Sequence, residues 1–173
     1  MKKFVRYAGW TVGVLVAVLL VAAAALYVYT QRHITRKWSV AGHALAIPTD
    51  SLAIARGRHV ATAISRCTGC HGRDFGGQVF IDVPPVAFLY AANLTRGRGA
   101  PPAWKPAANL TPAGIGHYKE DDFFRALREG KRPGGVSIDP LMPYAFTKNL
   151  TDDEIRALWL YLETVPPKAF GGR

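Results

Sequence analysis

The amino-acid sequence predicts an all-α protein, with about three main helices in one modest domain behind a single N-terminal transmembrane helix. Two patterns indicate this fold class: an uncharged apolar stretch over residues 7–30, and three later segments whose apolar residues recur every three or four positions. The 173 residues allow one domain plus an appendage, because a domain takes roughly 100 to 200 residues. We expect a cytoplasmic N-terminus over 1–6, a span over 7–30, a linker over 31–50, a domain over 51–167 and a tail over 168–173.

The stretch over 7–30 is long enough to cross a membrane as a helix, since the hydrocarbon layer needs about 20 residues. A cleavable signal sequence is the alternative, with Ala22–Ala25 as its cleavage site. The apolar run continues through Leu26–Tyr29, which favours an uncleaved anchor. Three basic residues precede the stretch and three follow it closely, so the positive-inside rule leaves the orientation undecided.

The net charge of the chain is +10. Beyond the anchor, 19 Lys and Arg stand against 12 Asp and Glu, so this part remains basic by 7. A positive charge favours encounter with acidic partners or anionic surfaces. The basic residues are scattered, and the anchor would place them at a membrane, which argues against nucleic acid as the partner.

Three segments carry helical signals. The first starts near Ser51 and continues directly into the cysteine motif; the second covers about 119–129, with acids in its first turn and Gly130 as its stop signal. The third follows a capping box of Thr151 and Glu154 and ends before Pro166. The roughly 45 residues between the first and second helices show no convincing strand alternation. Such a long connection suggests that a large apolar cofactor supplies the centre of the core.

The stretch "RCTGCHG" holds the only two cysteines of the chain, Cys67 and Cys70, with His71 directly behind them. The pattern C-x-x-C-H is the attachment signature of c-type haem. The two thiols can add to the two vinyl groups of the porphyrin, and the histidine can present its imidazole to the iron as proximal ligand. The sequence therefore predicts one covalently bound haem c.

Other cysteine chemistries remain as alternatives. A structural zinc site needs four ligands, and the fourth would have to come from His33, His43, His59 or His117. A thioredoxin-like site would have a strand before the motif, and a simple disulfide would leave His71 without a role. Haem is joined to such motifs outside the cytoplasmic membrane, so we expect the domain in the periplasm of a bacterium and the N-terminus in the cytoplasm.

The order of motifs resembles a class I cytochrome c domain over residues 51–167. These motifs are "CTGCH", "NLTPAGIGHY", "DDFFRALREGKRPGG", "PLMPY" and "LTDDEIRALWLYLETVP". Within this class, the chain is most similar to the haem domains in the cytochrome subunits of membrane-bound periplasmic alcohol, aldehyde and gluconate dehydrogenases. It implies a class I cytochrome c fold, with the helices wrapped around the haem. Those subunits usually carry three haem domains and this chain carries one, and residues 96–106 look like an insertion.

A second iron ligand is expected at Met142, the one methionine besides Met1, which stands between two prolines in "DPLMPYAF". A thioether suits a low-spin iron, and methionine with histidine ligation raises the reduction potential. The resemblance points to the same residue, because the axial methionine of the family stands in such a context. His59 and His117 are the alternatives for an iron bound by two histidines.

The resemblance also suggests supporting roles. Gly57 would allow close approach of an aromatic side chain, Trp159 or Tyr161, where the first and last helices cross. The carbonyl of Pro84 or Pro85 would accept a hydrogen bond from the proximal imidazole. Tyr118, Trp104 and Asn109 would reach the haem propionates.

Ligation by His71 and Met142 leaves no iron site for substrate, so we expect an electron carrier and not an enzyme. Its partners would be a dehydrogenase or quinol-oxidising complex as donor and an oxidase or soluble cytochrome as acceptor. The basic residues Arg66, Arg73, Lys131 and Arg132 would attract an acidic docking surface. Two other functions stay open: a haem enzyme or gas sensor with a displaceable methionine, and a structural haem subunit of a membrane complex.

Overall fold

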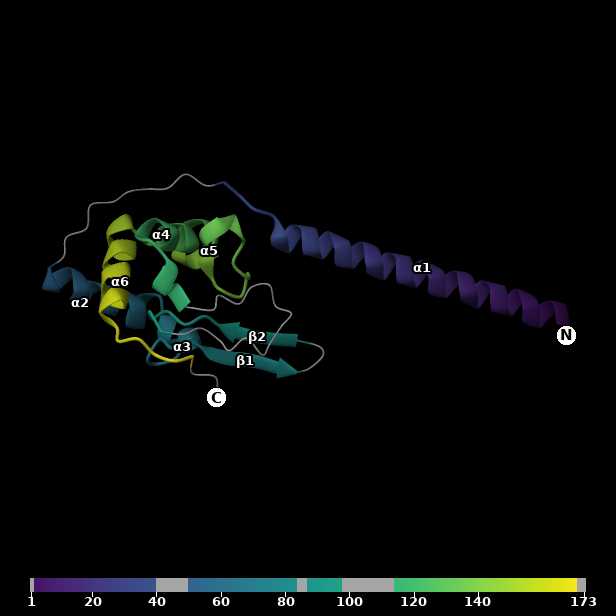
Figure 1. Cartoon of the computed structure of the whole chain (residues 1–173), viewed down its shortest axis with the longest axis horizontal. Helices are drawn as coiled ribbons and strands as arrows, with labels where there is room; N and C mark the ends of the chain where they lie inside the picture. Colours follow the sequence, from purple (N-terminus) through teal and green to yellow (C-terminus); the bar gives the residue numbers. More distant parts are fainter. Residues whose placement is uncertain (1, 40–49, 84–86, 98–113, 171–173) are drawn as a thin grey trace.

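A long helix, α1 (Lys2–Thr35), extends away from a small domain in the computed structural model of the chain (Figure 1). The structure describes residues 2–39, 50–83, 87–97 and 114–170. Within these ranges, α1 is the one helix long and apolar enough to cross a membrane. Its 34 residues would measure about 50 Å at 1.5 Å per residue. The helix continues five residues beyond the expected end of the span, so the segment after residue 30 begins as helix.

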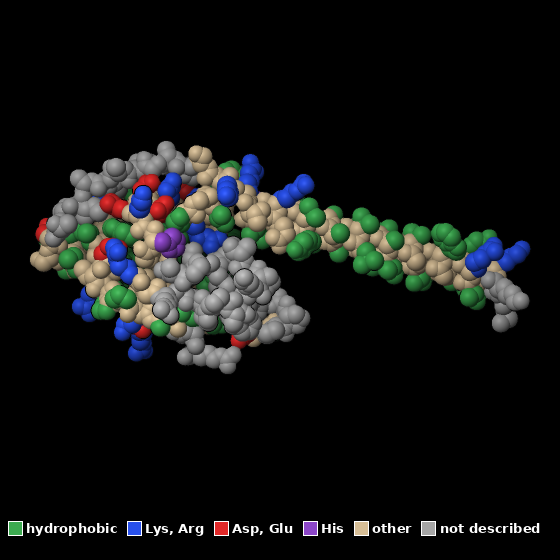
Figure 2. Space-filling view, in the orientation of Figure 1, with side chains coloured by type: hydrophobic (Ala, Val, Ile, Leu, Met, Phe, Trp, Pro, Cys, Tyr) green, Lys and Arg blue, Asp and Glu red, His purple; other side chains and the backbone are tan. Residues whose placement is uncertain are grey.

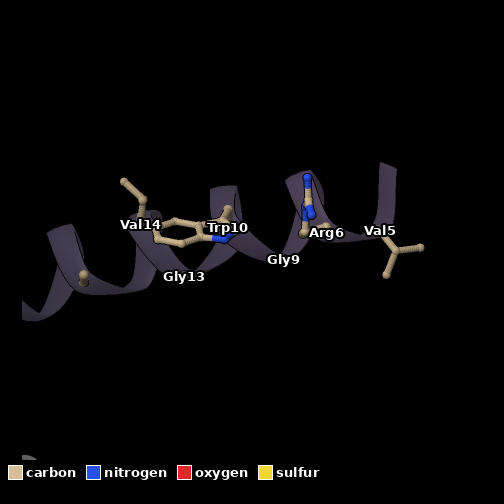
Figure 3. Close-up of a pocket in the computed structure, with 7 residues that line it drawn as sticks. Val5, Arg6, Gly9, Trp10, Gly13 and Val14 are labelled. Carbon is tan, nitrogen blue, oxygen red and sulfur yellow. The ribbon is translucent and has the colours of Figure 1, made fainter. Parts of the chain in front are cut away.

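One face of α1 is open at two glycines. Gly9 and Gly13 have no heavy atom within 4 Å of the position that a Cβ would occupy. Together with Trp10 and Arg6 they line a shallow depression along the helix (Figure 3). Over these two turns the backbone is accessible on this face of the helix, whereas large apolar side chains cover the other faces.

The domain contains the three helices that the sequence predicts. They are α2 (Ser51–His59), α4 (Glu120–Glu129) and α6 (Asp152–Thr164). Short helices add α3 (Cys67–His71) and α5 (Tyr144–Thr147), a π-helical turn (Val60–Ile64), and 3-10 turns at Gly114–His117 and Pro133–Gly135. The core collects the apolar faces of these helices: Val60, Ala61, Phe123, Phe124, Leu127, Ile155, Leu158 and Leu162.

Helices α2 and α6 cross in close contact (Figure 1). A Cβ on Gly57 would lie 1.8 Å from the carbonyl oxygen of Ala157 and 2.8 Å from Cβ of Tyr161. A glycine is therefore required for the two backbones to approach this closely. The close approach expected at Gly57 is confirmed, and the aromatic residue beside it is Tyr161.

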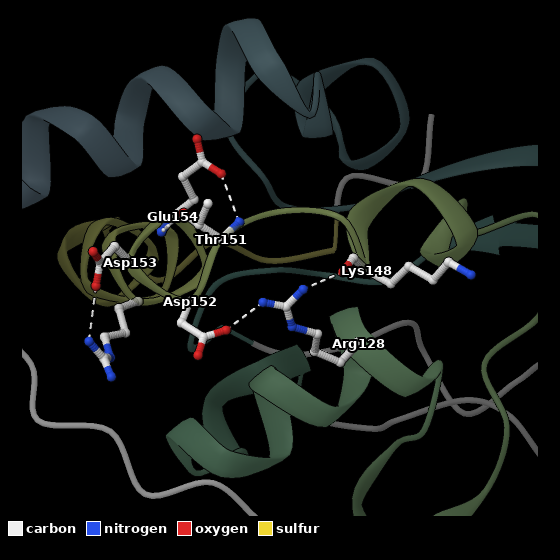
Figure 4. Close-up of polar contacts among 7 residues, drawn as sticks. Arg128, Lys148, Thr151, Asp152, Asp153 and Glu154 are labelled. Atoms are coloured by element: carbon white, nitrogen blue, oxygen red, sulfur yellow. Dashed lines mark hydrogen bonds and ion pairs between the residues drawn. The ribbon is translucent and has the colours of Figure 1, made fainter.

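Polar contacts fix the ends of the helices. The capping box of α6 is present, with Glu154 N donating to Thr151 Oγ1 at 3.2 Å and Thr151 N donating to Glu154 Oε2 at 2.9 Å. Arg128 of α4 donates to Asp152 at the start of α6 and to the carbonyl of Lys148 after α5 (Figure 4). One guanidinium thus joins three helices.

The structure adds a β-hairpin that the sequence reading missed. Strand β1 (Gln78–Val83) pairs antiparallel with β2 (Ala87–Ala91), and the register shifts between Val79 and Ile81. The strands do not alternate between apolar and polar residues: Phe80, Leu89 and Tyr90 line a cavity, and the apolar Phe80, Ile81 and Val83 are all exposed to solvent over 41% or more of their surface. A period of two was therefore absent from the sequence pattern.

Replacing Gly57 with Ala should destabilise the domain by about 1 to 3 kcal/mol, because the new methyl group overlaps the backbone of α6. Chemical denaturation of the haem-loaded chain, followed by far-UV circular dichroism, would measure this loss. Arg58→Ala is the matched control, since Arg58 is exposed on the same helix and its loss should cost less than about 0.5 kcal/mol. Equal midpoints for the two variants would contradict the crossing contact.

Candidate haem site

The motif Cys67–His71 forms its own short helix, α3, which a turn separates from α2. The expectation that the first helix continues directly into the motif is wrong. The backbone changes to π-helical geometry over Val60–Ile64, and Ser65 N donates to the carbonyl of Val60 at 2.8 Å. Arg66 then adopts a left-handed conformation with φ of 49°. This left-handed residue ends the first helix, so α3 can take its own direction toward the cavity.

The two thiols of the motif differ in burial. Cys67 packs against the core, and burial raises the pKa of its thiol to about 11. Cys70 is exposed and lines the cavity. In the described part of the chain, no three His, Cys, Asp or Glu side chains come together as a metal-binding group. The described residues therefore give no support to the zinc alternative.

His71 is buried, with 7% of its surface exposed. Its Nδ1 lies 2.7 Å from the carbonyl oxygen of Ala92. Burial lowers the pKa of the imidazole, and the hydrogen bond to Ala92 opposes that shift. A neutral ring that donates from Nδ1 keeps the lone pair of Nε2 for a metal, and such a hydrogen bond orients a ligating imidazole.

The carbonyl that accepts the hydrogen bond from His71 differs from the one expected from the sequence. Pro84 and Pro85, expected to supply this carbonyl, lie outside the described residues, whereas Ala92 just after β2 accepts the bond. The return strand of the hairpin thus brings the carbonyl to the motif, 21 residues further along the chain. The sequence carried no signal for this role, because any residue has a carbonyl.

A cavity lies beside His71. The space between its walls measures about 1060 Å³, and part of this space is open to solvent. Its walls come from the motif, the hairpin, the segment before α4 and the segment before α5. The apolar lining residues are Phe80, Leu89, Ala91, Ala92, Ile115, Ile138, Leu141 and Pro143. The mainly apolar lining and the convergence of four chain segments fit a large planar cofactor.

Met142 lines the same cavity as His71. Two hydrogen bonds hold its backbone in a tight turn, from Met142 N to the carbonyl of Asp139 at 2.9 Å and from Tyr144 N to the carbonyl of Met142 at 2.7 Å. The structure therefore brings together the two side chains expected to bind iron. His59 and His117 are both exposed and do not line this cavity.

Outside the haem motif, four polar side chains stand among the apolar ones in the cavity wall: Tyr90, Tyr118, Arg132 and Asp139. Burial raises the pKa of both tyrosines to about 12, while the charge of Arg132 opposes the rise. Both phenols therefore stay protonated at neutral pH and can donate hydrogen bonds. Tyr118, expected from the sequence to reach a haem propionate, lines the cavity; Trp104 and Asn109 lie outside the described residues.

Arg132 is a cavity residue that the sequence analysis assigned to a different role, the attraction of a protein partner. The loop that carries it folds back on itself, with Arg132 N donating to the carbonyl of Val136 at 2.8 Å. A guanidinium in an apolar wall suits a carboxylate, and a haem carries two propionates. The thiols of the motif, the neutral imidazole, the thioether and this cation together fit a haem c.

Comparison with known proteins agrees with this site. Residues 54–166 match the family model described as cytochrome c. The chain belongs to the cytochrome c family. Membership implies a covalently bound haem c, and the class I fold predicted from the sequence is consistent with the family and with the helical structure.

Curated relatives of this cytochrome c are subunits of dehydrogenases. The cytochrome c subunit of the quinone alcohol dehydrogenase of Gluconobacter oxydans (strain 621H) is 34% identical over 133 residues, which cover 74% of this chain and 25% of that subunit. The fructose dehydrogenase cytochrome subunit of Gluconobacter japonicus is 30% identical over 115 residues, or 64% of this chain and 21% of that subunit. The gluconate 2-dehydrogenase cytochrome c subunit of Pantoea cypripedii is 30% identical over 112 residues, or 62% and 22%.

This cytochrome c thus spans about a quarter of the length of these relatives. These relatives are named as cytochrome subunits of dehydrogenases, which agrees with the expectation of a chain that carries electrons and does not transform a substrate. The segment 96–106, expected to be an insertion, lies mostly outside the described residues.

Replacing Arg132 with Gln should lower the reduction potential of the haem-loaded chain by on the order of 50 mV, about 1 kcal/mol for one electron. A positive charge in the cavity wall destabilises the oxidised iron, so its removal favours oxidation. A spectroscopic redox titration measures the shift. Arg73→Gln is the control, because Arg73 is exposed and its charge is screened by solvent; equal shifts in both variants would contradict a special position for Arg132.

Proposed function

We propose that this chain is a membrane-anchored monohaem cytochrome c that transfers single electrons between a dehydrogenase or quinol-oxidising complex and a terminal acceptor. The observation that carries the proposal is the single cavity lined by His71, Met142 and Cys70. This set provides one nitrogen ligand, one sulfur ligand and an attachment point at the same place.

Each residue of the site has one task in this proposal. The thiols of Cys67 and Cys70 would hold the haem covalently, and His71 and Met142 would be the two protein ligands of its iron. When bound, the haem supplies reversible one-electron chemistry, and a pair of histidine and methionine ligands favours a high potential. With both axial positions filled by the protein, a substrate has no site at the iron.

Helix α1 is the proposed anchor. We infer that it spans the cytoplasmic membrane with residues 1–6 in the cytoplasm, and that residues 51–167 form the haem domain in the periplasm. Its length and apolar composition support the span, and the haem motif supports the periplasmic side. The described structure assigns residues 31–35 to the helix and 36–39 to an extended segment of the proposed linker over 31–50.

The names of the relatives support a dehydrogenase as electron donor. The proposed docking surface for an acidic partner now centres on Arg66 and Arg73, which are exposed beside the haem motif. Lys131 and Arg132 are both partly buried and lie in other contacts. The rate of electron exchange with an acidic partner should then fall as salt rises.

Replacing Met142 with Ala should lower the reduction potential by on the order of 100 mV or more and convert the low-spin haem spectrum to a high-spin one. The cause is the loss of the thioether ligand. Absorption spectroscopy and redox titration of the haem-loaded chain test both effects, with Phe146→Ala as control because Phe146 is exposed and is not among the residues that line the cavity. A low-spin spectrum that is unchanged in the Met142 variant would overturn ligation by Met142 and would mean that another group supplies the second iron ligand.

The full chain should stay in the membrane fraction after an alkaline carbonate wash, because an apolar helix of this length resists extraction from lipid. Mild detergent extraction should then recover it together with a dehydrogenase, quinol-oxidising or oxidase subunit, identified by mass spectrometry. Release of the chain by carbonate would show that α1 does not anchor it in the membrane. Recovery of the haem protein alone under the gentlest conditions would indicate that it is an independent electron carrier and not a subunit of a stable complex.

A further inference from the structure

The segment that follows α1 packs on a loop of the haem domain. Lys37 forms an antiparallel bridge with Val136, and Trp38 N donates to the carbonyl of Gly135 at 3.1 Å. A Cβ on Gly135 would lie only 2.4 Å from the carbonyl oxygen of Trp38. Two segments about 100 residues apart in the chain therefore meet backbone to backbone, directly beyond the proposed span.

This contact concentrates positive charge. Residues 31–39 contain Arg32, Arg36 and Lys37 and no acidic residue. Residues 130–138 contain Lys131 and Arg132, and one acid flanks this segment on each side, Glu129 and Asp139. Arg32, Arg36 and Lys37 are exposed. Figure 2 shows Lys and Arg side chains gathered where α1 meets the domain.

Trp38 stands at the centre of this charge. The guanidinium carbon of Arg36 lies 4.1 Å from the centre of its ring, and Nζ of Lys131 lies 4.7 Å from it. The indole itself is 41% exposed. Cations over an indole are attracted to its face. The two cations repel each other, and the charge of Glu129 acts on Lys131 in the opposite sense. A further anion beside the exposed Arg36 would add to that offset.

The position along the chain decides which anion is available. Lys37 lies seven residues beyond Thr30, five of them in α1 and two after its end. At about 1.5 Å for each helical residue and at most about 3.5 Å for each non-helical one, this corresponds to roughly 10 to 15 Å. This distance places the cluster at the headgroup layer, where tryptophan is enriched and where basic residues bind anionic lipids.

We propose that Arg32, Arg36, Lys37, Trp38 and Lys131 form a basic collar that binds anionic phospholipid headgroups and holds the haem domain against the membrane surface. The proposal rests on the proposed span of α1. Arg132 and Ile138, on the same loop as Lys131, line the haem cavity. The collar would therefore keep one wall of this cavity next to the bilayer, within reach of a redox partner embedded in the membrane.

The test uses the full, haem-loaded chain in bilayer discs of phosphatidylcholine, with or without added phosphatidylglycerol. Hydrogen–deuterium exchange of residues 36–39 and 130–138 should slow at least about fivefold when phosphatidylglycerol is present. The triple variant Arg36→Gln, Lys37→Gln and Lys131→Gln should lose this lipid dependence. The double variant Arg58→Gln and Arg73→Gln, which removes exposed charges elsewhere, should keep it.

Two adjacent glycines provide a second, matched pair. Gly134 and Gly135 have nearly equal positive φ angles of 81° and 79°, but a Cβ on Gly134 meets nothing within 4 Å. Gly135→Ala should displace the segment around Trp38 and abolish the effect of phosphatidylglycerol, while Gly134→Ala, with the same backbone strain, should retain it. Loss in both variants would mean that strain in the loop, and not the contact with Trp38, controls the result.

Equal exchange in both lipids by a chain firmly inserted in the discs would overturn the collar and leave the anchored cytochrome intact. A chain that carbonate removes from the discs would instead refute the anchor on which the collar depends.

Discussion

The close contact between α2 and α6 is the constraint on which the haem site depends. With no side chain at Gly57, the backbone of α2 rests on the carbonyl of Ala157. This contact fixes the direction in which α2 delivers the chain to the π-helical turn and then to Arg66, whose left-handed backbone starts the haem motif. Any substituent at Gly57 would therefore act on the site as well as on the core.

A second layer of structure closes around the cavity without forming a core of its own. The hairpin, the turn at Met142 and the loop at Arg132 each contribute side chains to the cavity wall. Polar bonds hold these segments, above all the bond between His71 and the carbonyl of Ala92. Such an arrangement is suited to a cofactor that provides the apolar centre, which explains how long irregular connections can occur in so small a domain.

The sequence was sufficient to predict what depends on local pattern. The three helices, the capping box of Thr151, the haem motif and the prominence of Met142 all follow from spacing and residue type. The structure confirmed the helices and the cap, and it brought Met142 into the cavity of His71. Features that depend on long-range contacts could not be predicted: the carbonyl of Ala92, the position of Arg132 and the pairing of Lys37 with Val136. The hairpin was missed because its strands face a cavity on one side and are apolar on both.

The π-helical turn before the motif imposes a rule on chain length. A π turn holds one residue more than an α turn, and here it lies directly before the residues that attach the haem. Substitutions in this turn leave that count unchanged. Deletion of a single residue would turn the end of this helix by about 100° around its axis and so change the direction in which Arg66 sends the chain into α3. The number of residues between Gly57 and Cys67 is thus itself a part of the site, as much as the identity of any side chain in it.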